Sequence, residues 1–239
     1  MTRSTRRTPG VRTSRTSEVQ QRVKALILER GLAAGDPMPT EVDLMEELDV
    51  SRNSLREALK ALQAVGIVEI RHGFGTYVGH RSLGALVDEL TFHGRMSLGQ
   101  RPGDLAHLVQ IREVLERGLV EQVLRAASES DLARLGDVMA RMEAEAADGE
   151  VSPEVDRLFH EVLYEPLHNP LVSQLLGAFW DVHHELQREL GPVGDPAGSV
   201  AERHRVIYEA VRAGDAAAAV RAMTVHFDGI RGRLTGLPD

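Results

Sequence analysis

The chain has 239 residues, enough for two ordinary domains, and its 42% hydrophobic and 27% charged residues are typical of a globular protein. It contains no cysteine, which excludes a disulfide framework and a thiolate metal site and favours a cytoplasmic location. No apolar run approaches the roughly 20 residues that cross a bilayer, so we expect no association with a membrane.

Charge is divided unevenly along the chain, whose net charge is −8. Residues 1–80 hold 12 Lys and Arg against 10 Asp and Glu, whereas residues 81–239 hold 16 against 26. Because contacts with DNA phosphates need only local positive charge, the acidic second part does not exclude DNA binding. The split favours two domains with different partners.

The first predicted segment is a flexible basic arm over residues 1–16. It holds five arginines and has Val11 as its one aliphatic side chain, so it buries too little apolar surface to offset its ordering entropy. Two interpretations stay open for the arm: an unstructured tail, or a segment that contacts DNA phosphates.

A DNA-binding domain is predicted for residues 17–79, from three helices and a hairpin. Apolar residues at helical spacing predict helices over residues 17–31, 40–48 and 51–65. Two short β-rich runs, residues 67–70 and 76–78, follow and are joined by a glycine-containing turn. Elements in this order make a winged helix-turn-helix.

Local signals place the ends of these elements. Thr40 and Asp43 are close to a capping box at the start of the second helix. Asp49 occupies the break before the third helix, where a residue that tolerates left-handed geometry is needed. Ser51 is placed to cap the third helix and Gly66 to end it.

The third helix is the candidate recognition helix. Polar side chains crowd its N-terminal end, where a helix in a major groove meets base edges and phosphates. They are Ser51, Arg52, Asn53, Ser54 and Arg56. Capping alone is the alternative explanation, but two arginines beside three small polar residues exceed what a cap requires.

A pattern of matched residues runs through this predicted domain. It consists of Gly35-Asp36-Pro37-Met38-Pro39-Thr40-Glu41, Leu44, Val50-Ser51-Arg52-Asn53-Ser54-Leu55-Arg56-Glu57-Ala58-Leu59, Leu62, Gly66, Gly73, Gly75-Thr76 and Val78. The pattern resembles the GntR family of bacterial regulators. The resemblance implies that the five polar residues of the third helix contact DNA, and that His72 and Gly73 enter the minor groove at the wing tip.

Two residues bear on which DNA sequence is read. We expect Arg52 to contact a guanine, because a guanidinium can bond O6 and N7 together. Val42 departs from the family pattern, which often has an arginine at this position that helps to read the operator. Since a valine cannot make that contact, the operator preference at this position differs from the one the family pattern implies.

Residues 80–239 are predicted to form an all-α bundle of six to seven helices that binds an effector and dimerises. Apolar residues recur at i, i+3 and i+4 through this part of the chain, and glycine, proline and aspartate fall at the breaks. The predicted helices cover residues 83–92, 105–127, 132–146, 155–164, 171–190, 199–211 and 216–234.

A candidate metal site lies within this bundle. Asp156 and His160 are four residues apart, so on one helix their side chains project from the same face. His204 and His226 follow on two later helices. Nitrogen and oxygen ligands of this kind suit Zn²⁺, Ni²⁺ or Mn²⁺. From spacing alone, ordinary histidines on helix surfaces remain the alternative.

Several motifs of this half resemble the FCD effector domain of the FadR branch of GntR proteins. They are Arg112 with Glu116, Asp156-Arg157-Leu158-Phe159-His160, His168-Asn169-Pro170, Glu202-Arg203-His204 and His226. The resemblance implies a divalent metal bound by Asp156, His160, His204 and His226, with a carboxylate effector completing the coordination. Arg112 is the candidate partner of that carboxylate; a buried salt bridge to Glu116 is the alternative role.

The two halves together predict a homodimeric transcription factor that binds near-palindromic operator DNA with its two recognition helices. We expect a repressor that is released when the small carboxylate binds. A metallohydrolase fused to a DNA-binding module and a DNA binder without an effector are the alternatives. We expect no enzymatic activity, because no His-Glu-x-x-His or similar motif supplies a general base.

Overall fold

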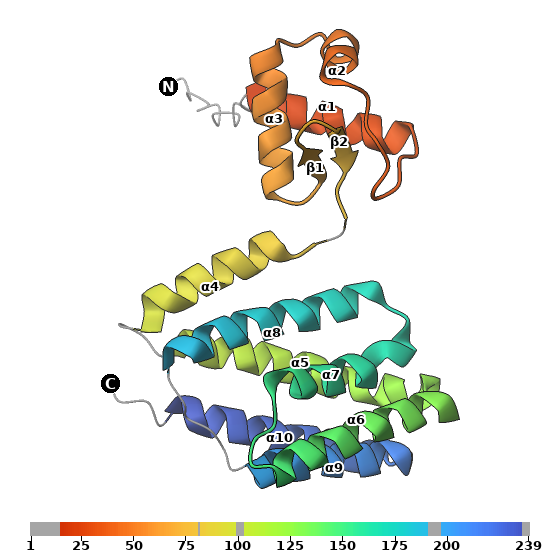
Figure 1. Ribbon diagram of the computed structural model, residues 1–239, viewed down its shortest axis with the longest axis vertical. Coiled ribbons are helices and arrows are strands. Elements are labelled where there is room, and N and C mark those ends of the chain that lie inside the picture. Colours follow the sequence, from red (N-terminus) through yellow and green to blue (C-terminus); the bar gives the residue numbers. More distant parts are fainter. Residues whose placement is uncertain (1–14, 81, 99–102, 191–196, 236–239) are drawn as a thin grey trace, which may run out of the picture. The chain divides into compact units, whose positions relative to one another are not determined.

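The computed structural model describes residues 15–80, 82–98, 103–190 and 197–235 (Figure 1). The chain divides into two compact units, Met1–Ala85 and Leu86–Asp239. Most of the predicted basic arm lies outside the described residues. Its last two residues belong to the first helix, α1, which begins at Arg15.

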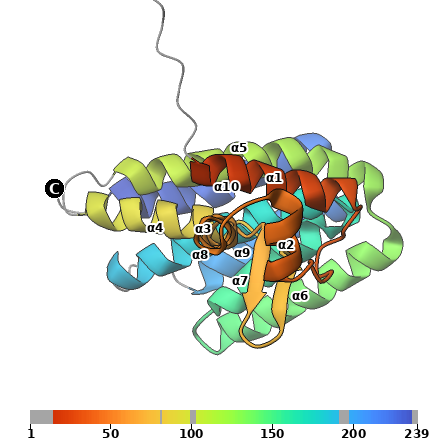
Figure 2. The ribbon, with the colours of Figure 1, turned by 90° about the horizontal axis from the view of Figure 1, so that it is seen from above.

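The first unit contains three helices and a two-stranded sheet. The helices are α1 (Arg15–Glu29), α2 (Glu41–Leu48) and α3 (Arg52–Ala64), and the strands are β1 (Val68–Arg71) and β2 (Gly75–Val78). The strands pair antiparallel, and Figure 2 shows them side by side, closed by a loop at one end. The predicted winged helix-turn-helix fold is confirmed.

Side-chain caps fix the helix ends of this unit as predicted. The Thr40 hydroxyl accepts a hydrogen bond from the Asp43 backbone N–H while the Asp43 side chain accepts one from Thr40, a complete capping box. Asp49 adopts the left-handed conformation with φ 45°. Ser51 accepts a hydrogen bond from the Ser54 N–H and so caps α3. These caps satisfy backbone groups that would otherwise lack a partner.

A small apolar core holds the three helices against the hairpin. Each helix contributes one buried stripe, and each strand contributes one buried valine. The core residues of this unit are Val19, Val23, Leu26, Ile27, Met38, Leu44, Leu48, Leu55, Ala58, Leu59, Leu62, Val68 and Val78. Because α3 buries only one side, its other side and its N-terminal end stay open to a partner.

Gly79 makes the closest backbone approach in this unit. A Cβ at this position would lie 2.1 Å from the carbonyl oxygen of Gly66, and the Gly79 N–H donates to the Ile67 carbonyl at 2.8 Å. We expect Gly79→Ala to destabilise the first unit by about 1–3 kcal/mol. The Gly66 carbonyl oxygen cannot move away from the new Cβ without disturbing the neighbouring hydrogen bond from Gly79 to Ile67. Amide hydrogen exchange should be faster throughout α1–α3, and unchanged exchange there would contradict the prediction. Amides of the second unit are the internal control.

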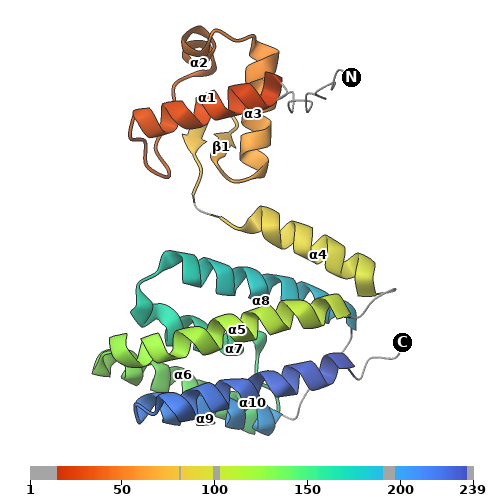
Figure 3. The ribbon, with the colours of Figure 1, turned by 180° about the vertical axis from the view of Figure 1, so that it is seen from behind.

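The second unit is all-helical among its described residues. Its α-helices are α4 (Gly84–Leu98), α5 (Gly103–Ala126), α6 (Glu129–Ala147), α7 (Pro153–Tyr164), α8 (Pro170–Leu190), α9 (Ala197–Arg212) and α10 (Ala216–Thr235). Helix α5 packs along α10, and α6 along α9 and α7 (Figure 3). Nowhere in the described residues does a helix combine the length and the apolarity that a membrane span requires.

Two features of this unit differ from the prediction. The helix predicted over residues 83–92 continues to Leu98, because Gly94 lies inside it and packs against Leu186, where a Cβ would be 2.6 Å from the leucine Cδ1. A 3₁₀ turn, Glu165–Leu167, fills the break predicted at Pro166 and ends at His168 in the left-handed conformation. Each is a local effect of packing or of proline geometry.

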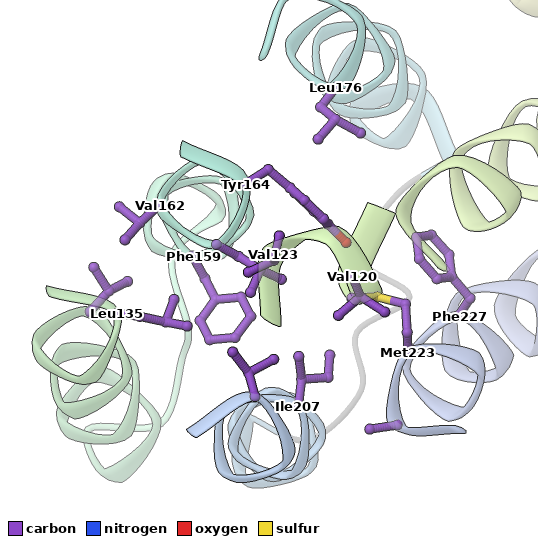
Figure 4. Packing of buried hydrophobic residues seen from close by; sticks show 14 of the residues in the cluster. Val120, Val123, Leu135, Phe159, Val162, Tyr164, Leu176, Ile207, Met223 and Phe227 are labelled. Atoms are coloured by element: carbon purple, nitrogen blue, oxygen red, sulfur yellow. The ribbon is translucent and has the colours of Figure 1, made fainter. Parts of the chain in front are cut away.

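The core of the second unit gathers side chains from six helices. Figure 4 shows Val120 and Val123 of α5, Phe159 of α7, Ile207 of α9 and Met223 of α10 converging on one another. All five are 0–1% exposed. Burial of each such side chain contributes about 1.5–3 kcal/mol, so this core holds α5, α7, α9 and α10 in a defined arrangement. These four helices also carry the candidate metal and effector residues.

Candidate DNA-binding helix and candidate metal centre

The N-terminal end of α3 presents the predicted DNA-contacting residues to solvent. Ser51, Arg52, Asn53 and Arg56 are exposed and Ser54 is half-buried beneath them. The Ser51 and Ser54 hydroxyls lie 2.9 Å apart. The apolar face of the same helix is fully buried. The fold therefore holds these polar side chains together at one helix end, with free backbone N–H groups beside them.

The two arginines of this cluster differ in their partners. Within the described residues, Arg52 has no hydrogen-bond or ion-pair partner. Arg56 lies 3.6 Å from Glu41 of α2, and both side chains are well exposed. Such surface pairs contribute at most about 1 kcal/mol, so a phosphate can replace Glu41 at little cost. Val42, the departure from the family pattern, is 52% exposed on α2.

The wing tip lies in the turn between β1 and β2. His72 and Gly73 are exposed there, and Gly73 has φ 80°, which favours glycine. Arg71 is held at the end of β1 by two hydrogen bonds to Glu69 and stacks 4.0 Å from the centre of the Tyr77 ring. Phe74 at the tip is 80% exposed and was not predicted as a site residue. The sequence feature that could have drawn attention to Phe74 is its position between two turn glycines, which leaves a large apolar side chain at the tip of a hairpin.

The second unit brings three of the four predicted metal ligands into one buried cluster. His160 of α7, His204 of α9 and His226 of α10 each offer a nitrogen, and these nitrogens lie within 4.8 Å of one another. The ring centres are 4.6–5.5 Å apart. All three side chains are 1–4% exposed. Residues separated by up to 66 positions in the sequence thus converge because their helices share one core.

Asp156, the fourth predicted ligand, lies beside this cluster, one helical turn before His160 on α7. Its Oδ1 lies 2.7 Å from His204 Nε2 and 4.0 Å from His160 Nε2. Although the first distance is short, neither atom meets hydrogen-bond geometry with a partner in the described residues.

The outward nitrogens of two histidines are fixed by the protein. His160 Nδ1 lies 2.6 Å from Glu116 Oε2, and His204 Nδ1 lies 2.8 Å from the Val200 carbonyl oxygen. Since both partners are acceptors, each Nδ1 is the donor of its pair, and each Nε2 faces the cluster. Histidines that ligate metals are oriented in the same way.

Burial and neighbouring charge set the ionisation of the cluster. Burial, followed by the charges on His204 and His160, holds the pKa of His226 well below its ordinary value. Burial alone would raise the pKa of the Asp156 carboxyl, but its charge interaction and close polar contact with His204, and the proximity of His160, lower the pKa overall. His226 is therefore neutral and Asp156 ionised near pH 7, the states in which each can bind a metal.

These residues fit a divalent metal ion. Within the described residues, the buried atoms of this cluster that make no hydrogen bond are Asp156 Oδ1, His160 Nε2, His204 Nε2 and both ring nitrogens of His226. Leaving such atoms unpaired costs about 1–3 kcal/mol each, a cost that a metal removes. One carboxylate oxygen with three imidazole nitrogens is a donor set for Zn²⁺, Ni²⁺ or Mn²⁺.

Arg112 lies on α5 beside this cluster and has one unpaired end. Its Nε donates to Glu116 Oε1 at 2.6 Å, which is the salt bridge considered from the sequence as the alternative role. Its Nη2 is buried without a hydrogen-bond partner in the described residues. The guanidinium carbon lies 5.4 Å from the Phe227 ring centre and 5.5 Å from that of Trp180. The salt bridge leaves part of the guanidinium available to an anion.

The sequence prediction missed residues that orient this site. Glu116 entered it only as a partner of Arg112, yet it also binds His160. Tyr164 donates a hydrogen bond to the Glu116 carbonyl at 3.0 Å. His160 and Tyr164 are four residues apart, so the sequence places them on the same face of α7, but it does not show that this face contacts Glu116.

Comparisons with known proteins match both units. Residues 15–78 match the model of bacterial regulatory proteins of the gntR family, and residues 107–229 match the FCD domain. The second range contains all four residues of the candidate metal centre as well as Arg112. Members of the first family are DNA-binding transcription regulators.

Individual proteins are similar over most of the chain. The HTH-type transcriptional regulator LutR of Bacillus subtilis is 31% identical over 86% of this chain and 94% of its own length. The HTH-type transcriptional repressor NanR of Cronobacter sakazakii is 33% identical over 68% of this chain and 62% of its own length. A solved GntR structure from Streptococcus agalactiae superposes with a TM-score of 0.66, at 27% identity, over 91% of this chain and 99% of its own. The chain therefore belongs to the GntR family of bacterial transcription regulators, as a member that carries an FCD domain.

Proposed function

We propose that this regulator is a homodimeric repressor whose hold on operator DNA is released by a small carboxylate bound at a divalent metal. The observation that carries the proposal is the set of buried, unpaired ligand atoms on α7, α9 and α10 beside the unpaired Arg112 Nη2. Buried polar atoms in folded proteins nearly always have a bonding partner, so atoms without one in the protein point to a bound ligand.

The DNA-binding half of the proposal assigns contacts to α3 and to the wing. Arg52 would read a guanine, and Ser51, Asn53, Ser54 and Arg56 would contact bases or phosphates at the same end of the helix. His72 and Gly73 would enter the minor groove. The exposure of all of these residues except the half-buried Ser54, and the lack of a partner for Arg52 within the described residues, support the assignment. Two copies of α3 in a dimer would match a near-palindromic operator.

The sensing half assigns the metal to Asp156, His160, His204 and His226. A divalent metal held by these residues would supply a Lewis acid for a carboxylate oxygen. Arg112 would bind the same carboxylate through Nη2, since a charge-assisted hydrogen bond is about twice as strong as a neutral one. Trp180 and Phe227 hold the guanidinium in place by cation–π contact and shield it from water.

Release of DNA would follow from a shift between two populations of the dimer. If the acid binds more tightly to dimers whose recognition helices do not match the operator, its binding lowers operator affinity. Linkage requires that operator DNA weaken acid binding by the same factor. The repressor direction is supported by the name of the similar NanR protein, a transcriptional repressor.

Two other functions can be separated from this one. A metal-dependent hydrolase would turn over an ester or amide and lose that activity with the metal, and it would also need a general base outside the ligand set. A DNA binder without an effector would keep the same operator affinity in every acid.

The single tryptophan of the chain gives a direct assay of the proposal. Trp180 is 5% exposed and lies against Arg112, so binding of an acid there changes its surroundings. Titration of the Zn²⁺-loaded protein with a panel of organic, sugar and amino acids should give a saturable change in tryptophan fluorescence with at least one of them. The same acid should weaken operator binding, typically 5–150-fold for coupled sites, in a fluorescence-anisotropy assay. If no acid in the panel alters operator affinity, the proposed release mechanism is wrong.

A further inference from the structure

Glu116 divides its carboxylate between the two parts of the candidate sensing site. The side chain is 0% exposed in the middle of α5. Oε1 accepts a hydrogen bond from Arg112 Nε at 2.6 Å, and Oε2 lies 2.6 Å from His160 Nδ1. One carboxylate thus joins the candidate anion-binding arginine directly to a candidate metal ligand.

The backbone at residue 116 is tied to the same neighbouring helix as the side chain. The Tyr164 hydroxyl donates to the Glu116 carbonyl at 3.0 Å, and Tyr164 is 2% exposed. His160 and Tyr164 stand one turn apart on α7, so this helix holds both ends of one residue on α5. The carboxylate therefore has little freedom to leave its two partners.

A carboxylate suits this position between two donors, because both of its oxygens accept hydrogen bonds. Arg112 Nε donates to Oε1, and His160 Nδ1 faces Oε2.

We propose that Glu116 is a positioning residue that couples metal binding at His160 to anion binding at Arg112. The inference rests on the proposed function, because it takes the metal and the carboxylate effector from there. Glu116 keeps the His160 lone pair on Nε2, and it holds Arg112 by Nε alone, which leaves Nη2 for the effector. A metal on Nε2 makes the Nδ1–H a stronger donor to Glu116, and linkage passes the effect in both directions.

An amide cannot do what this carboxylate does, although it has the same shape. Both Arg112 Nε and His160 Nδ1 must donate, and a glutamine has one acceptor oxygen and one NH₂ donor. If the oxygen faces Arg112, the NH₂ forces His160 Nδ1 to accept and places the proton on Nε2, where it blocks the metal. If the oxygen faces His160, the NH₂ opposes Arg112 Nε–H and displaces the arginine. Either arrangement damages one of the two binding events.

Glu116→Gln in the full-length protein tests the inference through two binding measurements. Zn²⁺ affinity is measured by competition with a chromophoric chelator, and anion binding to the Zn²⁺-loaded protein by acetate titration of Trp180 fluorescence. We expect a loss of about 10–100-fold in at least one of the two affinities, the usual effect of removing a partner of a metal ligand. Glu113→Gln is the matched control. Glu113 lies on the same helix, is 5% exposed and pairs with Arg117 and Arg231 instead, so both affinities should be unchanged.

The outcomes separate this inference from the function on which it rests. If the wild-type protein binds no Zn²⁺, the proposed function fails. If the wild-type protein binds Zn²⁺ and Glu116→Gln matches it in both affinities, only the role of Glu116 is wrong. Nitrogen-15 NMR of the histidines gives a test that needs no variant. In the wild-type protein we expect the His160 proton on Nδ1 before and after Zn²⁺ is added, and a proton on Nε2 in the free protein would overturn the inference.

Discussion

Replacing His204 with alanine is expected to abolish tight binding of a divalent metal and to remove the stabilisation that the metal confers. The imidazole of His204 is 1% exposed, belongs to the three-histidine cluster, and places Nε2 2.7 Å from Asp156 Oδ1. A metal present at 100 times its dissociation constant stabilises the folded state by about 2.7 kcal/mol. For a unit of this size, the loss corresponds to a fall in melting temperature of roughly 5–10 °C.

Calorimetry with and without added Zn²⁺ measures this effect, and two further variants make it specific. His93→Ala removes an exposed histidine of α4 and should keep the full Zn²⁺ response. Asp156→Asn keeps the shape of the fourth ligand and should weaken the response, because a neutral amide is a poorer ligand than a carboxylate. If Zn²⁺ raises the melting temperature of His204→Ala as much as that of the wild-type protein, the metal does not bind in this cluster.

Arg52→Ala is expected to abolish specific operator binding while leaving the fold intact. The side chain is exposed at the N-terminal end of α3 and has no partner within the described residues, so its removal exposes no buried group. A bidentate contact with guanine contributes about 1–3 kcal/mol of discrimination per site, and a dimer would lose two such contacts. Operator affinity should therefore fall by roughly 30-fold to 10⁴-fold.

Selection of duplexes from a random pool supplies the operator for this test, and fluorescence anisotropy measures its affinity. A base contact predicts that affinity for unrelated DNA changes little, whereas a phosphate contact predicts a uniform loss and a shallower salt dependence. Arg30→Ala is the control, because Arg30 pairs with Glu47 at a distance of 2.5 Å and lies outside the predicted DNA-contacting residues. An Arg52→Ala variant that protects the same operator from cleavage would show that α3 is not the recognition helix.

The fold of the first unit could be predicted in detail because its signals are local. Thr40, Asp43 and Ser51 cap helices through side chains within three residues of the groups that they bind. Asp49 and Gly73 adopt left-handed conformations that their residue types favour. Such signals do not depend on distant parts of the chain, so a single sequence suffices to read them.

The candidate metal centre depends on packing between helices that are far apart in the sequence. Spacing related Asp156 to His160, but it gave no reason to place His204 and His226 beside them; only the family resemblance did so. The role of Glu116 toward His160 bridges 44 residues and depends on the position of α7 against α5. The extension of α4 through Gly94 likewise depends on a contact with Leu186. These features come from tertiary contacts, which periodicity does not report.

Native mass spectrometry of the full-length protein can detect the proposed metal, effector and dimer in one experiment. The sample is purified without added metal, measured, and measured again after incubation with Zn²⁺, Ni²⁺ and Mn²⁺ in turn, with elemental analysis to identify the bound ion. We expect a dimer of 26.2-kDa protomers with one divalent ion in each protomer. We also expect the wild-type dimer to hold a small acid that the His204→Ala dimer does not retain. If the protein carries no ion and no acid under any of these conditions, it is not a metal-dependent carboxylate sensor.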